Sequence, residues 1–434
     1  MNAVNQGAVL LKLSLISVLM GIIGAFVLFA FVFVLEHGIE FLWVELPHFL
    51  GLPSFHEVPT GILYPPLVIS LTLIGGLLVG ALTKISKVPP TILQQEIEEI
   101  MKTGRMGMLH GMVAMIRGLV ALIFGGSIGP EGPLTGGCAA LGTWFAEQSK
   151  LPKPEVIICL SSTVSGMFGG FLNTPFAWPL IVTEGGLESG KLNWKLLLPA
   201  IIAGAVGAGL FYVLTGSSFM GTFPVPPVLD FNFMYLIYAV PLGLVGALLG
   251  ILFVYFFNFL KKLIGPFESR RPIELALLAG LVLGVVASFF PLVLFDGANV
   301  NTLTLGTLIG NAAGLGTPML VAYSFMKLLV TVVCLAFGWA GGFFFPSFFI
   351  GGAMGLAINQ LFPFIPLAIC MSCVMVGIGM ALAKIPIALT LVLALAFGLR
   401  LSPVVAVAAV TAFICTYGVH FVFDEKIDEK SWHV

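Results

Sequence analysis

Glu131 is an acidic residue between two apolar stretches, in the segment GGSIGPEGP over residues 125–133. A carboxylate at membrane depth is costly and marks a functional site by default. Gly132 leaves the backbone amides open, and Pro133 suits the first position of a new helix. Because a helix N-terminus combines unpaired N–H groups with the positive end of a dipole, it binds anions. We expect Glu131 to be a tethered anion at such a site; the simpler alternative is a structural N-terminal cap.

A second segment, GGFFFP over residues 341–346, has the same character. Its two glycines and Pro346 predict another helix start with accessible amides, and its phenylalanines would exclude water from that start. A low dielectric strengthens the attraction between amides and an anion. A glycine-rich packing turn would have a similar sequence, but the combination with Glu131 favours an anion site.

The composition predicts the environment of these segments. Of the 434 residues, 59% are hydrophobic and 9% are charged, whereas soluble domains carry about 25% charged residues. A bilayer explains this difference, so we expect a membrane protein and no enzyme. The formal net charge of −1 argues against nucleic acid as a partner. The pair Cys370 and Cys373 lies in an apolar run and is interpreted as small hydrophobic residues, so we expect no metal site and no cofactor.

Apolar runs follow one another from residue 8 to residue 423, and several are too short to cross a bilayer alone, which takes about 20 residues. The first run, 8–35, is too long for a signal peptide and is interpreted as a retained membrane helix. The 52 glycines and 27 prolines interrupt many runs. Broken helices at membrane depth occur where protein or a water-filled pathway surrounds them, and in transporters they mark the binding site. The sequence therefore predicts an all-α polytopic membrane protein.

Two halves of the chain show related patterns. Three pairs recur in the same order at a nearly constant offset: Arg117 and Lys327 (210 residues), Pro133 and Pro346 (213), and Pro175 and Pro386 (211). This predicts an N-terminal membrane repeat over 1–215, a linker over 216–232, a C-terminal membrane repeat over 233–423 and a short polar tail over 424–434.

These motifs resemble those of the CLC chloride channel and transporter family. GPEGP (129–133) is similar to the family's G-R/K-E-G-P motif, and GGFFFP (341–346) to its G-x-F-x-P motif. The segments NTPFAWPLIVTE (173–184) and AKIPIALTLVL (383–393) resemble the segments that follow in each half. The resemblance implies two inverted-topology repeats of tilted and broken helices, a homodimer with one pathway per subunit, and no cytoplasmic regulatory domains. It also implies a multi-pass protein of the bacterial inner membrane.

The resemblance assigns roles by position. Glu131 would be the gating and proton-carrying glutamate, and the amides of Gly132, Phe343, Phe344 and Phe345 would bind the anion. The supporting motif residues are Gly129, Pro130, Pro133, Gly341, Gly342 and Pro346.

Four departures from the family pattern leave parts of the site open. The family's G-S-G-I-P motif is replaced by ISKVP, so either Ser86 or Lys87 takes the serine position. Pro130 stands where the family has Arg or Lys. The antiporters' inner proton glutamate aligns with Gly185, and Glu184 is the candidate substitute. Tyr417 is a poor match for the pore tyrosine.

Arg117 and Lys327 would place positive charge near the pathway and favour anions, or would snorkel to the membrane surface.

Together these patterns favour proton-coupled chloride antiport, with an uncoupled anion channel or a fluoride exporter as alternatives of the same fold.

Two alternatives come from other classes of protein. Residues 125–129 also satisfy G-x-S-x-G, the nucleophile pattern of serine hydrolases, with Ser127 as the nucleophile. Neither His110 nor His420 lies in a context typical of its base. A cation or neutral-solute transporter would need clustered carboxylates, but only Glu131 and Glu184 lie in apolar surroundings.

Overall fold

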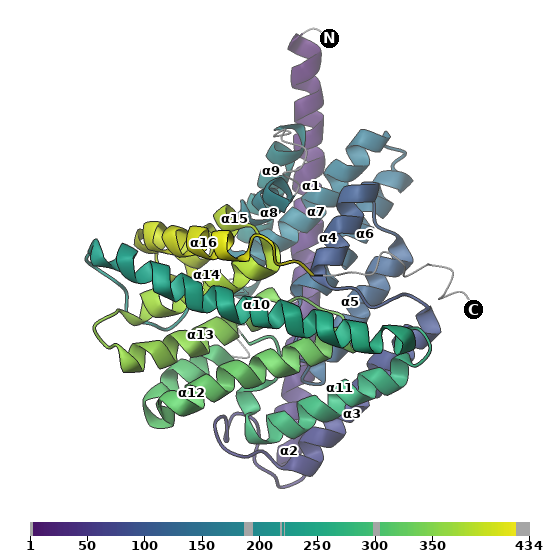
Figure 1. The fold of residues 1–434 in the computed structure, drawn as a ribbon. Helices are drawn as coiled ribbons and strands as arrows, with labels where there is room; N and C mark the ends of the chain where they lie inside the picture. Colours follow the sequence, from purple (N-terminus) through teal and green to yellow (C-terminus); the bar gives the residue numbers. More distant parts are fainter. Residues whose placement is uncertain (1–2, 186–193, 218, 221, 298–303, 422–434) are drawn as a thin grey trace. The chain divides into compact units, whose positions relative to one another are not determined.

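A computed structural model describes residues 3–185, 194–217, 219–220, 222–297 and 304–421, and these form helices joined by turns (Figure 1). The α-helices are α1 (Ala3–Glu40), α2 (Leu46–Phe49), α3 (Pro65–Ser86), α4 (Leu93–Thr103), α5 (Met108–Ile123), α6 (Glu131–Gln148), α7 (Lys153–Leu172), α8 (Ala177–Gly185), α9 (Trp194–Thr215), α10 (Met234–Glu268), α11 (Pro272–Phe289), α12 (Thr304–Ala336), α13 (Phe344–Leu361), α14 (Leu367–Ala383), α15 (Pro386–Phe397) and α16 (Ser402–Thr416). The expected all-α fold is confirmed. The predicted tail over 424–434 lies outside the described residues.

Nine of the described helices are long and apolar enough to cross a membrane. The N-terminal run continues from α1 through a π-helical turn, Phe41–Glu45, into α2. Other apolar helices are shorter, among them α5, α14 and α15. α12 contains a kink at Gly316, whose φ is 72°, two residues before Pro318. Broken and short helices therefore lie among full-length spans, as the glycine and proline content predicts.

The chain divides into two compact units. One unit comprises Met1–Val34, Leu93–Ile116 and Gly132–Gly221, and the other comprises Leu35–Ile92, Arg117–Glu131 and Thr222–Val434. The predicted repeat boundaries, with a linker over 216–232, stay a prediction.

Close packing of α3 on α11 organises the second unit (Figure 1). A Cβ on Gly280 would overlap the backbone carbonyl of Thr72, so these two helices approach through their backbones. Small residues allow such close helix packing in lipid. In the same unit α10 packs on α14 and α16, and α13 packs between α12 and α14.

In the first unit, α7 packs on α9 and α8 contacts both. Trp178 of α8 donates its indole N–H to the Ser161 hydroxyl of α7 at 2.9 Å. Ser165 of α7 donates to the Ala200 carbonyl of α9 at 2.6 Å. These buried hydrogen bonds satisfy polar groups that lipid could not.

Corresponding helices of the two predicted repeats have related local geometry. α6 begins at Glu131 and α13 begins at Phe344, which are 213 residues apart, and a proline is the third residue of each helix. The prediction that Pro133 is the first residue of its helix is therefore wrong, because the helix starts two residues earlier, at Glu131. α7 and α14 both end on a left-handed residue, Asn173 with φ 54° and Lys384 with φ 56°.

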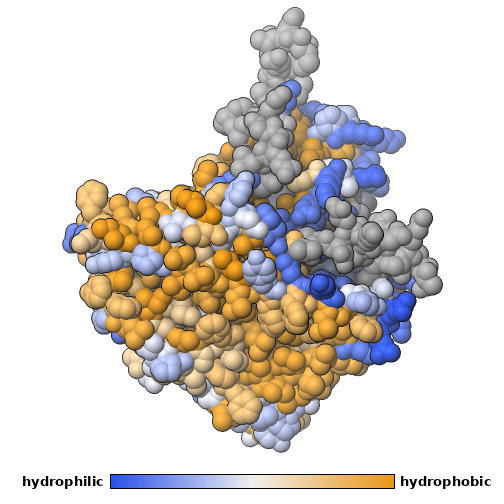
Figure 2. All heavy atoms as spheres, in the orientation of Figure 1, coloured by the Kyte–Doolittle hydropathy of each residue, from blue (hydrophilic) through white to orange (hydrophobic). Residues whose placement is uncertain are grey.

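Apolar side chains cover a broad area of the face drawn in Figure 2, including the surface of α10 and α11. Exposed residues of α10 include Leu248, Tyr255 and Phe259, and those of α11 include Leu281 and Phe289. Such exposed apolar surface suits a helix that faces lipid rather than water.

A candidate anion site at two helix starts

The two glycine-rich motifs meet in the second unit. Gly129 and Gly342 exchange two backbone hydrogen bonds, Gly129 N–H to Gly342 O at 2.8 Å and Gly342 N–H to Gly129 O at 2.7 Å. This short antiparallel bridge holds the segment before α6 against the segment before α13. Two stretches 213 residues apart in the sequence therefore build one site.

The Glu131 carboxylate occupies the N-terminus of α13. The backbone N–H of Phe344 donates to Glu131 Oε1 at 2.6 Å, and the Phe345 amide also interacts with this carboxylate. The Glu131 side chain is fully buried. A hydrogen bond from an N–H to a charged acceptor contributes about 1.5–3 kcal/mol. The carboxyl group of Glu131 therefore lies on an amide of the other motif, and its predicted role as a tethered anion stays a prediction.

Both bridging glycines are required by the position of this carboxyl group. A Cβ on Gly129 or on Gly342 would overlap carboxyl atoms of Glu131. A Cβ on Gly341 would instead meet the side chain of Ile128. Among these three glycines, Gly129 and Gly342 make room for the glutamate side chain.

Aromatic rings surround the start of α13. Phe343 and Phe345 are at most 1% exposed, and Phe344 is 7% exposed. The ring of Phe421 lies 5.6 Å from that of Phe343. Tyr417, in contrast, is 70% exposed and packs against Phe413. The C-terminal aromatic residue beside the motif is thus Phe421, which the sequence motifs did not identify.

Arg117 is completely buried and holds the segment that follows α3. Its guanidinium donates to the carbonyls of Val88 at 3.0 Å and Pro89 at 3.1 Å. Ser86 is the last residue of α3, and its hydroxyl accepts the Val88 N–H at 3.3 Å. The side chain of Lys87 is exposed and its φ is 57°. Full burial shows that Arg117 does not snorkel to a surface.

Lys327 is also completely buried, in α12. Its ammonium donates to the carbonyls of Val293, Leu294 and Phe295 at 2.9, 3.3 and 2.7 Å. The next residue, Asp296, is 1% exposed, and its carboxylate interacts electrostatically with both Lys327 and Glu131. None of the sequence motifs includes Asp296. Its only signal was an acidic residue, in FDGAN, directly after an apolar run.

Gly132 and Glu184 belong to the first unit. Gly132 is buried. Because it is the second residue of α6, its amide lies in the first turn of that helix. Glu184 is the penultimate residue of α8 and is 7% exposed. The roles predicted for these residues stay predictions.

The Ser127 hydroxyl is used in packing. It pairs with the hydroxyl of Thr331 at 2.8 Å, and both side chains are fully buried. A serine nucleophile needs a general base within hydrogen-bonding reach, and a threonine hydroxyl is not one. Within the part of the chain that the structure describes, no group of His, Cys, Asp and Glu side chains could hold a metal ion.

The structure thus places a buried carboxyl group on the amides of a helix start within a multi-pass membrane fold, and such a group marks a functional site by default. A sequence profile of the voltage gated chloride channel family (Voltage_CLC) matches residues 75–417. The chain therefore belongs to this family, whose members are channels and transporters and not enzymes. The resemblance read from the motifs is confirmed, and the hydrolase hypothesis for Ser127 is wrong.

Known relatives agree with this assignment. The chain is 25% identical over 378 residues to "Putative ion-transport protein YfeO" of Salmonella newport (strain SL254), with 85% of each chain covered. It is also similar in fold to a slow cyanobacterial Cl−/H+ antiporter, at a TM-score of 0.76 and 16% identity, over 95% of each chain. A CLC-type fluoride/proton antiporter matches with a TM-score of 0.63 and 19% identity, over 96% of this chain and 98% of the other.

Proposed function

We propose that this protein exchanges a small anion, chloride in the first instance, for protons, and that Glu131 is the group both ions share. The observation that carries the proposal is the hydrogen bond from the Phe344 amide to the Glu131 carboxylate. The amides at the start of α13 bind a negative charge, and that charge belongs to a side chain that protonation can neutralise.

The exchange follows from competition for these amides. Ionised Glu131 accepts the Phe344 N–H and so excludes a free anion. A protonated carboxyl group has no charge for the helix N-terminus to attract. It can then leave, and an anion takes its place on the amides of Phe344 and Phe345. Each anion that enters therefore needs Glu131 to be protonated, which links the two movements.

The surroundings favour an anion over a cation. Phe343 and Phe345 exclude water, so the attraction between amides and anion is less screened. Lys327 supplies a buried positive charge in the same unit. A cation site would instead need clustered carboxylates with no buried ammonium beside them, or carbonyl oxygens aimed at the ion.

Further parts of the pathway belong to the same proposal. Gly132 would add an amide from the start of α6, and Ser86 would contact the anion from the end of α3. Glu184 would receive protons in place of the inner glutamate of related antiporters, since Gly185 has no side chain that can carry one. The protein would work as a homodimer in the bacterial inner membrane.

The test is paired flux measurement in liposomes that carry a chloride gradient, for the native protein and Glu131→Gln. We expect uphill proton movement with the native protein, and chloride flux without proton movement with the variant. Chloride flux without coupled protons in the native protein would contradict antiport and would leave an uncoupled channel. Absence of chloride flux, with flux of fluoride, would make fluoride the substrate.

A further inference from the structure

Asp296 lies in an unusual turn after α11. Its neighbours Phe295 and Gly297 both have left-handed backbone conformations, with φ of 60° and 101°. Residues other than glycine seldom adopt positive φ, and such strain persists where the surrounding structure holds it in place. The side chain of Asp296 is 1% exposed. A strained turn that buries a carboxylate suggests that the carboxylate has a function.

Lys327 holds this turn on both sides of Asp296. Its ammonium binds the carbonyl of Phe295 at 2.7 Å, and a Cβ on Gly297 would lie 3.2 Å from Lys327 Cε. The ammonium also lies 5.3 Å from the ring centre of Phe349. The Asp296 carboxylate interacts with the Lys327 charge. The lysine therefore fixes the turn and is at the same time a charge partner of the aspartate.

Asp296 also interacts electrostatically with Glu131. The turn and the Glu131 segment are joined directly, because the Phe295 N–H donates to the carbonyl of Gly125 at 3.1 Å. The second unit thus buries two carboxylates and one ammonium that influence one another. Two interacting carboxylates in a buried site seldom ionise together, and their titrations are coupled.

Building on the proposed function, we propose that Asp296 is a second proton-binding carboxylate of the anion site, and that it takes up a proton when an anion binds. When Glu131 is protonated and the amides are empty, ionised Asp296 balances the charge of Lys327. When an anion occupies the amides, the anion, Lys327, Asp296 and protonated Glu131 together carry no net charge only if Asp296 is protonated. A buried net charge is costly, so anion binding and protonation of Asp296 favour each other.

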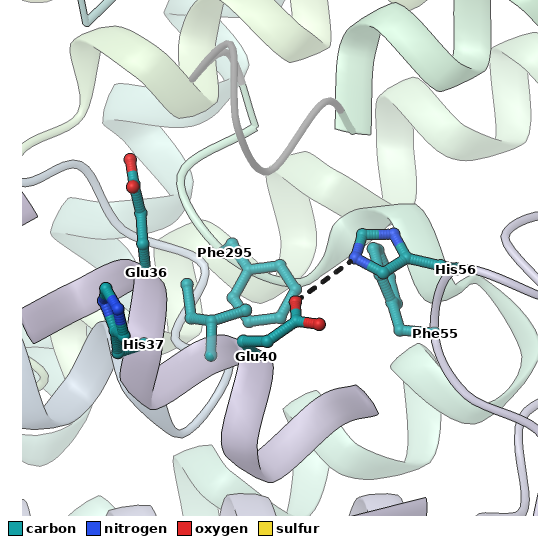
Figure 3. A pocket seen from close by; sticks show the side chains of 7 residues that line it. Glu36, His37, Glu40, Phe55, His56 and Phe295 are labelled. Carbon is teal, nitrogen blue, oxygen red and sulfur yellow. Dashed lines mark ion pairs between the residues drawn. The ribbon is translucent and has the colours of Figure 1, made fainter. Parts of the chain in front are cut away.

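A pocket lies beside the turn. It has a volume of about 300 Å³ and is lined by Glu36, His37, Ile39, Glu40, Phe55, His56 and Phe295. Figure 3 shows Glu40 and His56 facing each other beside the ring of Phe295. Their side chains are 54% and 52% exposed, and Glu40 Oε2 lies 3.8 Å from His56 Nε2. Phe295, the residue before Asp296, lines this pocket but is only 1% exposed, so the pocket ends one residue short of the carboxylate.

The experiment measures chloride binding to purified Glu131→Gln, in which no carboxylate competes for the amides. Calorimetry at several pH values, in two buffers of different ionisation enthalpy, reports the protons taken up per anion. We expect uptake that approaches one proton, with an affinity that falls by up to tenfold per pH unit above the titration of Asp296. The double variant Glu131→Gln/Asp296→Asn should bind chloride with no proton uptake and no such pH dependence.

Other titratable groups surround this turn, and they supply the control. Glu36, His37, Glu40 and His56 line the pocket, and Cys334 lies near Lys327. The double variant Glu131→Gln/His56→Gln should keep the proton uptake on chloride binding. The proposal would be overturned if this variant lost the proton uptake while Glu131→Gln/Asp296→Asn kept it. Chloride binding without proton uptake in Glu131→Gln alone would overturn it as well, even if Asp296→Asn failed to fold. Absence of both chloride and fluoride binding would refute the anion site, and the proposed function with it.

Discussion

Replacing Gly342 with alanine is expected to displace the Glu131 carboxylate from the amides of α13. The new Cβ would overlap the carboxyl carbon of Glu131. The backbone of Gly342 has little freedom to retreat, because its N–H and its carbonyl both bond to Gly129. The glutamate side chain is the partner that must move.

The size of the effect follows from the bonds that would be lost. The Phe344 amide donates to Glu131 at 2.6 Å, and one such charged hydrogen bond is worth about 1.5–3 kcal/mol. Even about 1.4 kcal/mol is a factor of ten in occupancy. We therefore expect the carboxylate to occupy the amides at least about tenfold less than in the native protein.

The assay is the ratio of protons to anions moved in liposomes. Gly342→Ala should keep its anion flux while this ratio falls by about tenfold or more. Gly341→Ala is the matched control, since its Cβ meets the side chain of Ile128 and not Glu131. An unchanged ratio in Gly342→Ala, or an equal fall in Gly341→Ala, would refute the reasoning that the carboxylate must occupy this position.

Three further predictions concern other polar groups. Lys327→Met should destabilise the protein by about 3–5 kcal/mol, because it leaves a buried charge partner and three carbonyls unpaired; thermal unfolding in detergent measures this. Ser127→Ala should cost about 1 kcal/mol through its bond to Thr331 and leave anion flux unchanged. The Ser54 amide and hydroxyl hold the pKa of Glu57 below its ordinary value of 4.5. The contribution of ionised Glu57 to the stability of this loop is therefore present above pH 4.5 and is lost as the pH falls through the lowered pKa. Protection of the Ser54 amide from hydrogen exchange measures this contribution.

Each of these predictions has a clear contrary result. Native stability of Lys327→Met would mean that the turn before Asp296 does not depend on the ammonium. Loss of transport in a stable Ser127→Ala protein would give the hydroxyl a direct part in the pathway. For the loop, Glu57→Gln is the control: the same pH dependence in this variant would exclude the Glu57 carboxylate as its source.

The helical fold could be predicted because its cause is local. Backbone groups in lipid must be satisfied within a helix, so each apolar run from residue 8 to residue 423 indicates its own helix. Helix starts were less certain, since the first turn of α6 includes Glu131 and Gly132 ahead of the proline. That boundary lies at Glu131, whose side chain bonds to the distant segment that begins α13.

The candidate anion site was predictable as far as its motifs reach. The amides of Phe344 and Phe345 and the carboxylate of Glu131 belong to two motifs whose glycines and prolines specify helix starts. No sequence pattern indicated Phe421, because its ring contacts Phe343 only in the folded protein and the two residues are far apart in the sequence. Asp296 escaped notice for the same reason, as its partners lie in other segments of the chain.

The sequence by itself determined the membrane environment, the two helix starts and the acidic residue beside one of them. Composition and local geometry are sufficient to determine these features. Only the tertiary structure decided that Gly129 pairs with Gly342, that the Phe344 amide binds Glu131, and that Lys327 and Asp296 join the same buried group. These contacts link segments far apart in the chain, and their charges influence one another only where folding has brought them together and removed the water between them.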